Sequence, residues 1–183
     1  MTADSGSYPG LSAGGGEPDT PPVDEFRPHR DSLTNVLVVG GTPERRDQVA
    51  RAFHLESLLR AGAFVHVDCA REEPRLRAAL RGWTSSAPGS ELNPLRAAAQ
   101  GTIYLDSVEQ LSSDTQGLLL AFARRLQTAP PSAGETSCPG RLVTGNPTGL
   151  ARAVSEGRFL AALFDALDKV RVQLEDITPG GSA

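Results

Sequence analysis

Short apolar runs alternate with longer amphipathic segments along most of the chain. Five of these runs are rich in β-branched residues, which is typical of strands, and they occur in NVLVVG, AFVHVDC, TIYLD, RLVTG and KVRVQL. The segments between them carry apolar residues at helical spacing, which predicts helices over 43–60, 71–81, 112–127 and 148–167, the last one broken near Gly157. Strands that alternate with helices indicate a parallel sheet covered on both faces. The sequence therefore predicts a three-layer α/β fold with a parallel sheet of about five strands.

Four segments rich in Gly, Pro and Ser interrupt this pattern. Residues 1–32 contain almost no aliphatic side chains, so they cannot bury enough apolar surface to offset chain entropy, and we expect a disordered tail. Residues 82–94 and 128–140 are predicted to be loops, and residues 178–183 a flexible tail. The remaining residues, 33–177, are expected to form one domain within the chain of 183 residues.

Charge and residue counts argue against several classes of function. The formal net charge is −4, which does not indicate a general affinity for nucleic acid. Two cysteines and three histidines, scattered along the chain, match no disulfide framework or metal-ligand spacing, so no metal site is expected. No apolar run is long enough to cross a bilayer and no signal-peptide pattern is present, so we expect a cytoplasmic protein.

The first predicted strand runs into a Gly-Gly turn and a helix, in the stretch VLVVGGTPERRDQVARAFH. A turn of this kind can cradle a phosphate when it reads G-x-x-x-x-G-K-[ST], because glycines expose backbone N–H groups and the lysine supplies positive charge. Counted from Gly40, the second glycine is Arg45, the lysine is Arg46, and Pro43 removes one backbone N–H. The Thr-Pro-Glu sequence that begins at Thr42 fits a helix start instead, with an N-cap hydroxyl, proline at the first position and an acid in the first turn. We therefore predict a structural turn whose N–H groups are capped by threonine.

Four blocks of sequence, in the same order, resemble the AAA+ ATPase domain of sigma-54-dependent transcription activators. The stretch above aligns without a gap to that family's VLIxGExGTGKExVARAIH, and FVHVDCA resembles its FVxVNCA. GTIYLDSVEQLSSDTQGLLLAFARRL is similar to the Walker B strand GTLFLDEI and the helix after it, and GRFLAALFDALDKVRVQLEDI to GRFRxDLYYRLNVxxIxLPPL. The resemblance covers residues 34–177 and implies a P-loop NTPase core of the AAA+ type.

The resemblance also implies that the scaffold is kept while the nucleotide chemistry is lost. Asp106 matches the family's aspartate that helps to hold magnesium, but the catalytic glutamate beside it is Ser107, which cannot act as a carboxylate base. A polar Thr-Asn pair has become Asn-Pro at Asn146, and two arginines that reach a neighbouring subunit's nucleotide correspond to Leu160 and Ala166. The vestigial nucleotide-site positions are Gly40, Gly41, Thr42, Pro43, Arg45, Arg46, Asp47, Asp106, Ser107 and Asn146.

Together these features predict a catalytically inactive AAA+ core that binds no cofactor and acts on a protein partner, such as another AAA+ regulator or a signalling protein. The GAFTGA motif that contacts sigma-54 in the family is missing between the second and third predicted strands, so the resemblance does not extend to that contact. The chain ends soon after the fifth predicted strand, so we expect neither a helical lid nor a DNA-binding helix-turn-helix, and no DNA binding.

Several alternatives remain open at this stage. The main one is a residual ATP-binding switch or weak ATPase that uses Arg46 and Asp106 with magnesium; direct DNA binding is a third. The first strand also resembles response-regulator receiver domains (VLVVDDDPxxR), although a receiver has no counterpart to GRFLAALFDAL. Cys69 is interpreted as a small buried hydrophobe, and Trp83 either packs on its own domain or anchors a partner.

Overall fold

The structure, a computed structural model, describes residues 33–84, 93–128 and 140–174. The predicted tails, 1–32 and 178–183, lie outside the described residues, as does most of each predicted loop. The strands are β1 (Val36–Val39), β2 (Phe64–Asp68), β3 (Thr102–Asp106), β4 (Arg141–Asn146) and β5 (Val170–Gln173). The helices are α1 (Pro43–Leu55), α2 (Cys69–Thr84), α3 (Pro94–Ala97), α4 (Ser113–Thr128), α5 (Ala151–Ser155) and α6 (Ala161–Leu167), with 3-10 turns η2 (Leu58–Ala61) and η3 (Val108–Gln110).

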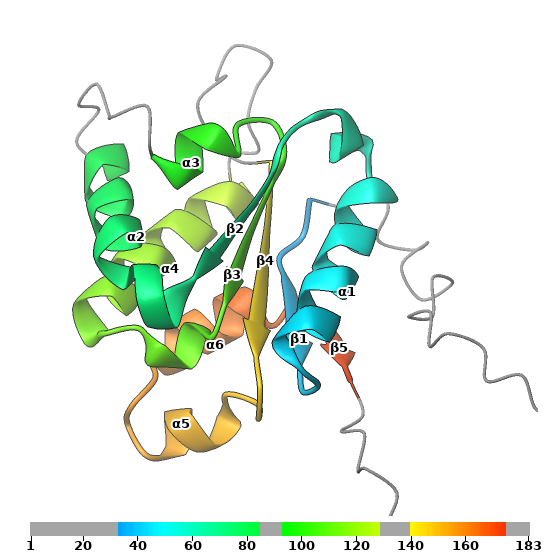
Figure 1. Ribbon diagram of the computed structural model, residues 1–183. Coiled ribbons are helices and arrows are strands. Elements are labelled where there is room, and N and C mark those ends of the chain that lie inside the picture. Colours follow the sequence, from blue (N-terminus) through cyan, green and yellow to red (C-terminus); the bar gives the residue numbers. More distant parts are fainter. Residues whose placement is uncertain (1–32, 85–92, 129–139, 175–183) are drawn as a thin grey trace, which may run out of the picture.

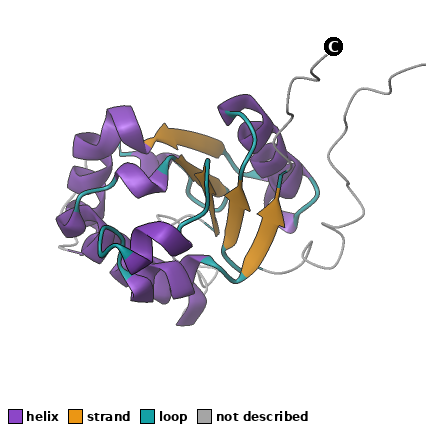
Figure 2. Cartoon of the chain, turned by 90° about the horizontal axis from the view of Figure 1, so that it is seen from below, coloured by secondary structure: helices purple, strands orange, loops and turns teal. Residues whose placement is uncertain are grey.

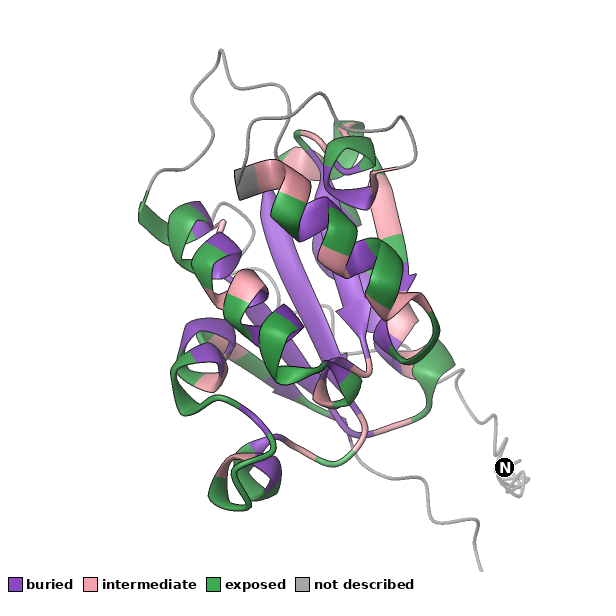
Figure 3. Cartoon of the chain, turned by 90° about the vertical axis from the view of Figure 1, so that its left-hand side faces the viewer, coloured by how far each residue is buried: buried purple, intermediate pink, exposed green. Residues whose placement is uncertain are grey.

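All five predicted strands are present, and they form one parallel sheet in the order β2-β3-β4-β1-β5 (Figure 1). Figure 2 shows the strands between helices on either side, so the predicted three-layer α/β fold is confirmed. Alternate side chains of β1 pack against the helices on opposite faces of the sheet. Val36 and Val38 pack in the cluster that contains α1, whereas Leu37 and Val39 pack in the cluster that contains α2, α4 and α6. Both faces of β1 are covered, and all of its residues are buried and apolar. Figure 3 shows that most of the sheet is buried beneath the helices.

The helices differ from their predicted bounds mainly at the ends. The helix predicted over 43–60 ends at Leu55, because the Ser57 hydroxyl accepts a hydrogen bond from the Leu59 N–H and caps the separate turn η2. The helix predicted over 71–81 is longer at both ends, so that Trp83, placed in a predicted loop, is helical. The predicted break near Gly157 is confirmed: this glycine, at φ +70°, separates α5 from α6. The short helix α3 was not predicted.

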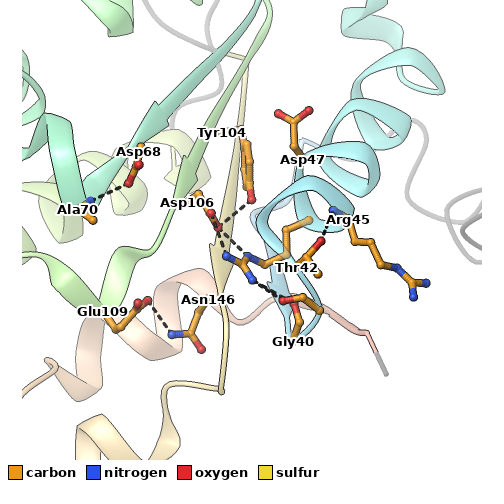
Figure 4. Close-up of polar contacts among 12 residues, drawn as sticks. Gly40, Thr42, Arg45, Asp47, Asp68, Ala70, Tyr104, Asp106, Glu109 and Asn146 are labelled. Carbon is orange, nitrogen blue, oxygen red and sulfur yellow. Dashed lines mark hydrogen bonds and ion pairs between the residues drawn. The ribbon is translucent and has the colours of Figure 1, made fainter. Parts of the chain in front are cut away.

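The topology brings the ends of β1, β3 and β4 together at one edge of the sheet. β1 and β4 are neighbours, yet the helix after β1 lies on one face and the helices after β4 lie on the other. In open α/β sheets, neighbouring strands whose following helices lie on opposite faces form a topological switch point, and ligands bind in the crevice beyond the carboxyl ends of these strands. The turn at Gly40, the end of β3 at Asp106 and the end of β4 at Asn146 all lie at this edge (Figure 4).

Candidate functional site

The turn between β1 and α1 is capped by its own threonine, as predicted. The Thr42 Oγ1 atom accepts a hydrogen bond from the Arg45 N–H at 3.3 Å, and Pro43 occupies the first helical position. The Thr42 carbonyl oxygen accepts the Arg46 N–H at 3.0 Å. The pKa of Glu44 is lowered because its carboxylate accepts its own backbone N–H and the Thr42 hydroxyl. Several N–H groups that would face a phosphate are therefore bound to oxygens of the protein.

The two glycines of the turn are required by the chain's own packing. Gly40 has φ +88° and Gly41 has φ +63°, in the left-handed region that favours glycine. A Cβ atom on Gly40 would lie 2.5 Å from the carbonyl oxygen of Leu174, just after β5. The Gly40 N–H donates to the carbonyl oxygen of Asn146 at 3.0 Å, which ties the turn to the end of β4.

Arg46 extends from the first turns of α1 to the end of β3 and forms a two-pronged ion pair with Asp106, which is labelled in Figure 4. Its Nε donates to Oδ1 at 2.7 Å and its Nη2 to Oδ2 at 2.9 Å. The remaining nitrogen, Nη1, donates to the carbonyl oxygens of Gly41 at 2.7 Å and Gly40 at 3.3 Å. Arg46 is only 2% exposed and Asp106 4%. The side chain at the lysine position of the phosphate motif therefore lies inside the site and bonds to the site's aspartate.

The Asp106 carboxylate is held by further donors. The Tyr104 hydroxyl donates to Oδ1 at 2.9 Å. Burial alone would raise the pKa of Asp106, but hydrogen bonds from Arg46 and Tyr104, joined by the Ser107 N–H, outweigh it and lower the pKa below its ordinary value. Burial and the nearby carboxylate raise the pKa of Tyr104, so its hydroxyl stays protonated as the donor. A Cβ atom on Gly145 would lie 2.6 Å from the Tyr104 hydroxyl and closer still to Asp106.

The remaining predicted positions divide between this cluster and the surface. Asn146 lies beside the cluster, where its Nδ2 donates to Oε2 of Glu109 at 2.8 Å (Figure 4). Ser107 has φ +57°, in the left-handed region, and begins η3 without a side-chain cap. Asp47 lies on the outer side of the site, where its carboxylate contacts Arg51 Nε at 2.6 Å and His66 Nδ1 at 3.3 Å. The structure thus brings most of the predicted residues together, but not Asp47, and the Arg45 side chain points away from the cluster (Figure 4).

Sequence reasoning missed three residues of the site. Tyr104 lies two positions before Asp106 on the same strand, so the alternation of a strand places both side chains on one face, and this signal was available. Glu109 and Gly145 carried no local signal, because their roles depend on contacts with Asn146 and Asp106 from other strands.

The other residues singled out from the sequence are structural. Cys69 is fully buried, as predicted, and burial together with nearby carboxylates raises the pKa of its thiol. The Trp83 ring packs edge-on against Phe122 with ring centres 5.0 Å apart, which is the intradomain alternative of the two. Within the part of the chain that the structure describes, no group of three or more His, Cys, Asp and Glu residues is placed to hold a metal. The described helices include none with the length and apolarity needed to span a membrane.

Comparison with known proteins identifies the family. The model of the Sigma-54 interaction domain matches residues 22–173. The acetoin catabolism regulatory protein of Cupriavidus necator is 29% identical over 152 residues, which are 79% of this chain and 23% of that protein. The transcriptional regulatory protein XylR of Pseudomonas putida is 30% identical over 156 residues, 78% of this chain and 28% of XylR. The chain thus spans about a quarter of the length of these relatives.

Solved structures agree with this assignment. The structure of NtrX from Brucella abortus in complex with ADP superposes with a TM-score of 0.66 at 26% identity, covering 82% of this chain and 34% of that one. The fold is that of the P-loop NTPases, as the resemblance implied. With the family model matching most of its residues, the chain belongs to the Sigma-54 interaction domain family, whose relatives regulate transcription.

Proposed function

We propose that this chain is a non-catalytic AAA+-type module that works in transcription regulation through protein contacts and does not hydrolyse ATP. The observation that carries the proposal is the buried, two-pronged pair between Arg46 and Asp106. In P-loop NTPases a Walker B aspartate holds the magnesium ion that bridges the phosphates. Here both oxygens of that carboxylate accept hydrogen bonds from Arg46, and one also accepts from Tyr104.

The turn after β1 supports the same conclusion for the phosphates. Phosphate cradles present backbone N–H groups, but the carbonyl oxygens of Gly40 and Gly41 face the Arg46 guanidinium. A nucleotide would have to displace this side chain and leave a buried charge without its partner, at a cost of about 3–5 kcal/mol. Such a cost weakens affinity by about 10²- to 4 × 10³-fold. Because Ser107 replaces the family's glutamate, the residue directly after Asp106 supplies no carboxylate to prepare a water molecule.

The proposed action is contact with another protein, either an intact AAA+ regulator or a signalling protein. The relatives named above are transcription regulators, which supports a proposed role in the same process. A module with a permanently filled site would bind its partner equally well with and without ATP. Affinity capture from the native organism, with and without ATP and magnesium in the wash, tests this expectation. An interaction that requires ATP would contradict it.

Calorimetric titration with ATP and magnesium, followed by an assay of phosphate release, tests the absence of ATP chemistry. We expect no binding up to about 1 mM ATP, a range in which specific sites are readily detected. An ATP-hydrolysing relative serves as the positive control, and the Asp106→Ala variant identifies signal that arises elsewhere. Micromolar binding that disappears in Asp106→Ala would establish the alternative, a residual nucleotide switch or weak ATPase that uses Arg46 and Asp106.

A further inference from the structure

We propose that Asp106, Tyr104 and the carbonyl groups of Gly40 and Gly41 form a guanidinium-binding site, that Arg46 is its tethered occupant, and that the emptied site takes up a free guanidinium ion. This inference concerns the ligand chemistry of the chain itself and does not depend on whether the module binds nucleotide. It rests on the geometry of the acceptors around one planar cation.

The acceptors match the shape of a guanidinium group. The two carboxylate oxygens of Asp106 accept hydrogen bonds from Nε and Nη2 of Arg46, at 2.7 and 2.9 Å. The carbonyl oxygens of Gly41 and Gly40 accept hydrogen bonds from the third nitrogen, Nη1, at 2.7 and 3.3 Å. All three nitrogens of the group therefore have partners at hydrogen-bond distance. A magnesium ion requires oxygens at about 2.1 Å in octahedral geometry, and an ammonium ion lacks the planar fork.

The surroundings hold the acceptors in place when the occupant is removed. Tyr104, which is fully buried, donates its hydroxyl proton to Asp106 Oδ1 and orients the carboxylate. The missing side chain of Gly145 leaves the room in which the carboxylate and the Tyr104 hydroxyl lie. The turn at Gly40 is tied to β4 by its own N–H and does not depend on Arg46 alone. The charge of Asp106 makes the emptied site anionic.

Chemical rescue of an Arg46→Ala variant tests the proposal. We expect this variant to melt about 10 °C below the wild type, because a buried carboxylate has lost its partner. Guanidinium chloride, raised to about 50 mM, is far too dilute to denature the protein and should recover at least half of the loss. Sodium chloride and ammonium chloride at the same concentrations should recover little of it.

Two further variants give the controls. Arg51→Ala removes an arginine from the same helix that is about half exposed and paired with Asp47; its melting temperature should fall by about 2 °C or less and should not respond to guanidinium. Arg46→Ala combined with Asp106→Asn should lose the rescue, because the site's charge is gone. If Arg46→Ala does not fold in buffer alone, the same titration is followed as recovery of helical circular dichroism.

Four outcomes would overturn the proposal. They are no recovery with guanidinium, equal recovery by ammonium or sodium, the same gain in Arg51→Ala, and rescue that persists when Asp106 is asparagine. Recovery that is specific to guanidinium and requires Asp106 would establish the site. No nucleotide is present in these assays, so their result is independent of the test of ATP binding.

Discussion

Replacing Arg46 with methionine should destabilise the domain more than removing both members of its ion pair. Methionine fills much of the volume of the arginine stem but leaves the Asp106 carboxylate, 4% exposed, with the Tyr104 hydroxyl and the Ser107 N–H as donors. Removing one partner of a buried ion pair costs about 3–5 kcal/mol. Since domains of this size unfold with about 5–15 kcal/mol, urea unfolding followed by circular dichroism at pH 7 should show the loss clearly.

The double variant Arg46→Met with Asp106→Leu is the matched control. It removes both buried charges, and such replacements are often neutral or stabilising. The Tyr104 hydroxyl then lacks the acceptor that it has in the wild type, so about 1–3 kcal/mol of the loss should remain. The double variant should therefore be more stable than Arg46→Met alone. If it is equally unstable, the loss comes from packing and the electrostatic argument is wrong.

The pH dependence of the same variant provides a second check with a definite sign. In the wild type the pKa of Asp106 is lowered, so its contribution is present above the unfolded pKa and is lost as the pH falls through the folded pKa. In Arg46→Met, burial without the cation should raise the pKa of Asp106 instead, so the variant is penalised at neutral pH and relieved as the carboxyl group takes up a proton. The difference in unfolding free energy should therefore narrow from pH 7 toward pH 4. A difference that widens on acidification would refute the reasoning.

Three other substitutions or measurements follow from single contacts. In the same urea assay, Gly145→Ala should lower the free energy of unfolding by about 1–3 kcal/mol, because the added methyl group crowds Asp106. Gly117→Ala lies on an open helix surface and should raise the free energy of unfolding by about 0.5–1 kcal/mol. The opposite order of stability would contradict the contact geometry. Thr42→Ala should lose about 1 kcal/mol of helix capping, and Thr42→Ser should retain most of it. Cys69 should resist a thiol reagent until the chain unfolds, since it is fully buried with a raised pKa; peptide mapping would reveal labelling of the folded chain.

The layers of the fold could be predicted because they depend on local pattern. The β-branched runs mark strands that are buried on both faces, and the order of strands and helices restricts the topology. Helix ends were less predictable, because the stop at Leu55 depends on a cap from Ser57 and α3 has only four residues. The turn at Thr42 was predictable in detail, since its cap, proline and acid are consecutive in the sequence.

The chemistry of the site was only half predictable, because its central contact joins residues 60 positions apart. From the sequence, Arg46 was a lysine replacement and Asp106 a residual acid, and the alternative that used both assigned them to a nucleotide and magnesium rather than to each other. Only the packing of α1 over the carboxyl end of β3 shows that they are a pair. Gly145 could not be identified for a similar reason, since the atoms that exclude a side chain there belong to another strand.

The pair also explains why neither member is expected to change by itself. Losing Arg46 leaves a buried carboxylate, and losing Asp106 leaves a buried guanidinium, so either single change carries the cost of an unpaired charge. Arg46→Lys keeps a charge but gives up the second bond to Asp106 and the fork that reaches two carbonyl oxygens. Such a variant would still lack the N–H that Pro43 removes and the glycine that Arg45 replaces. A single reversion at Arg46 therefore lowers the stability of the domain without rebuilding a phosphate cradle, so each residue of the pair disfavours a change in the other.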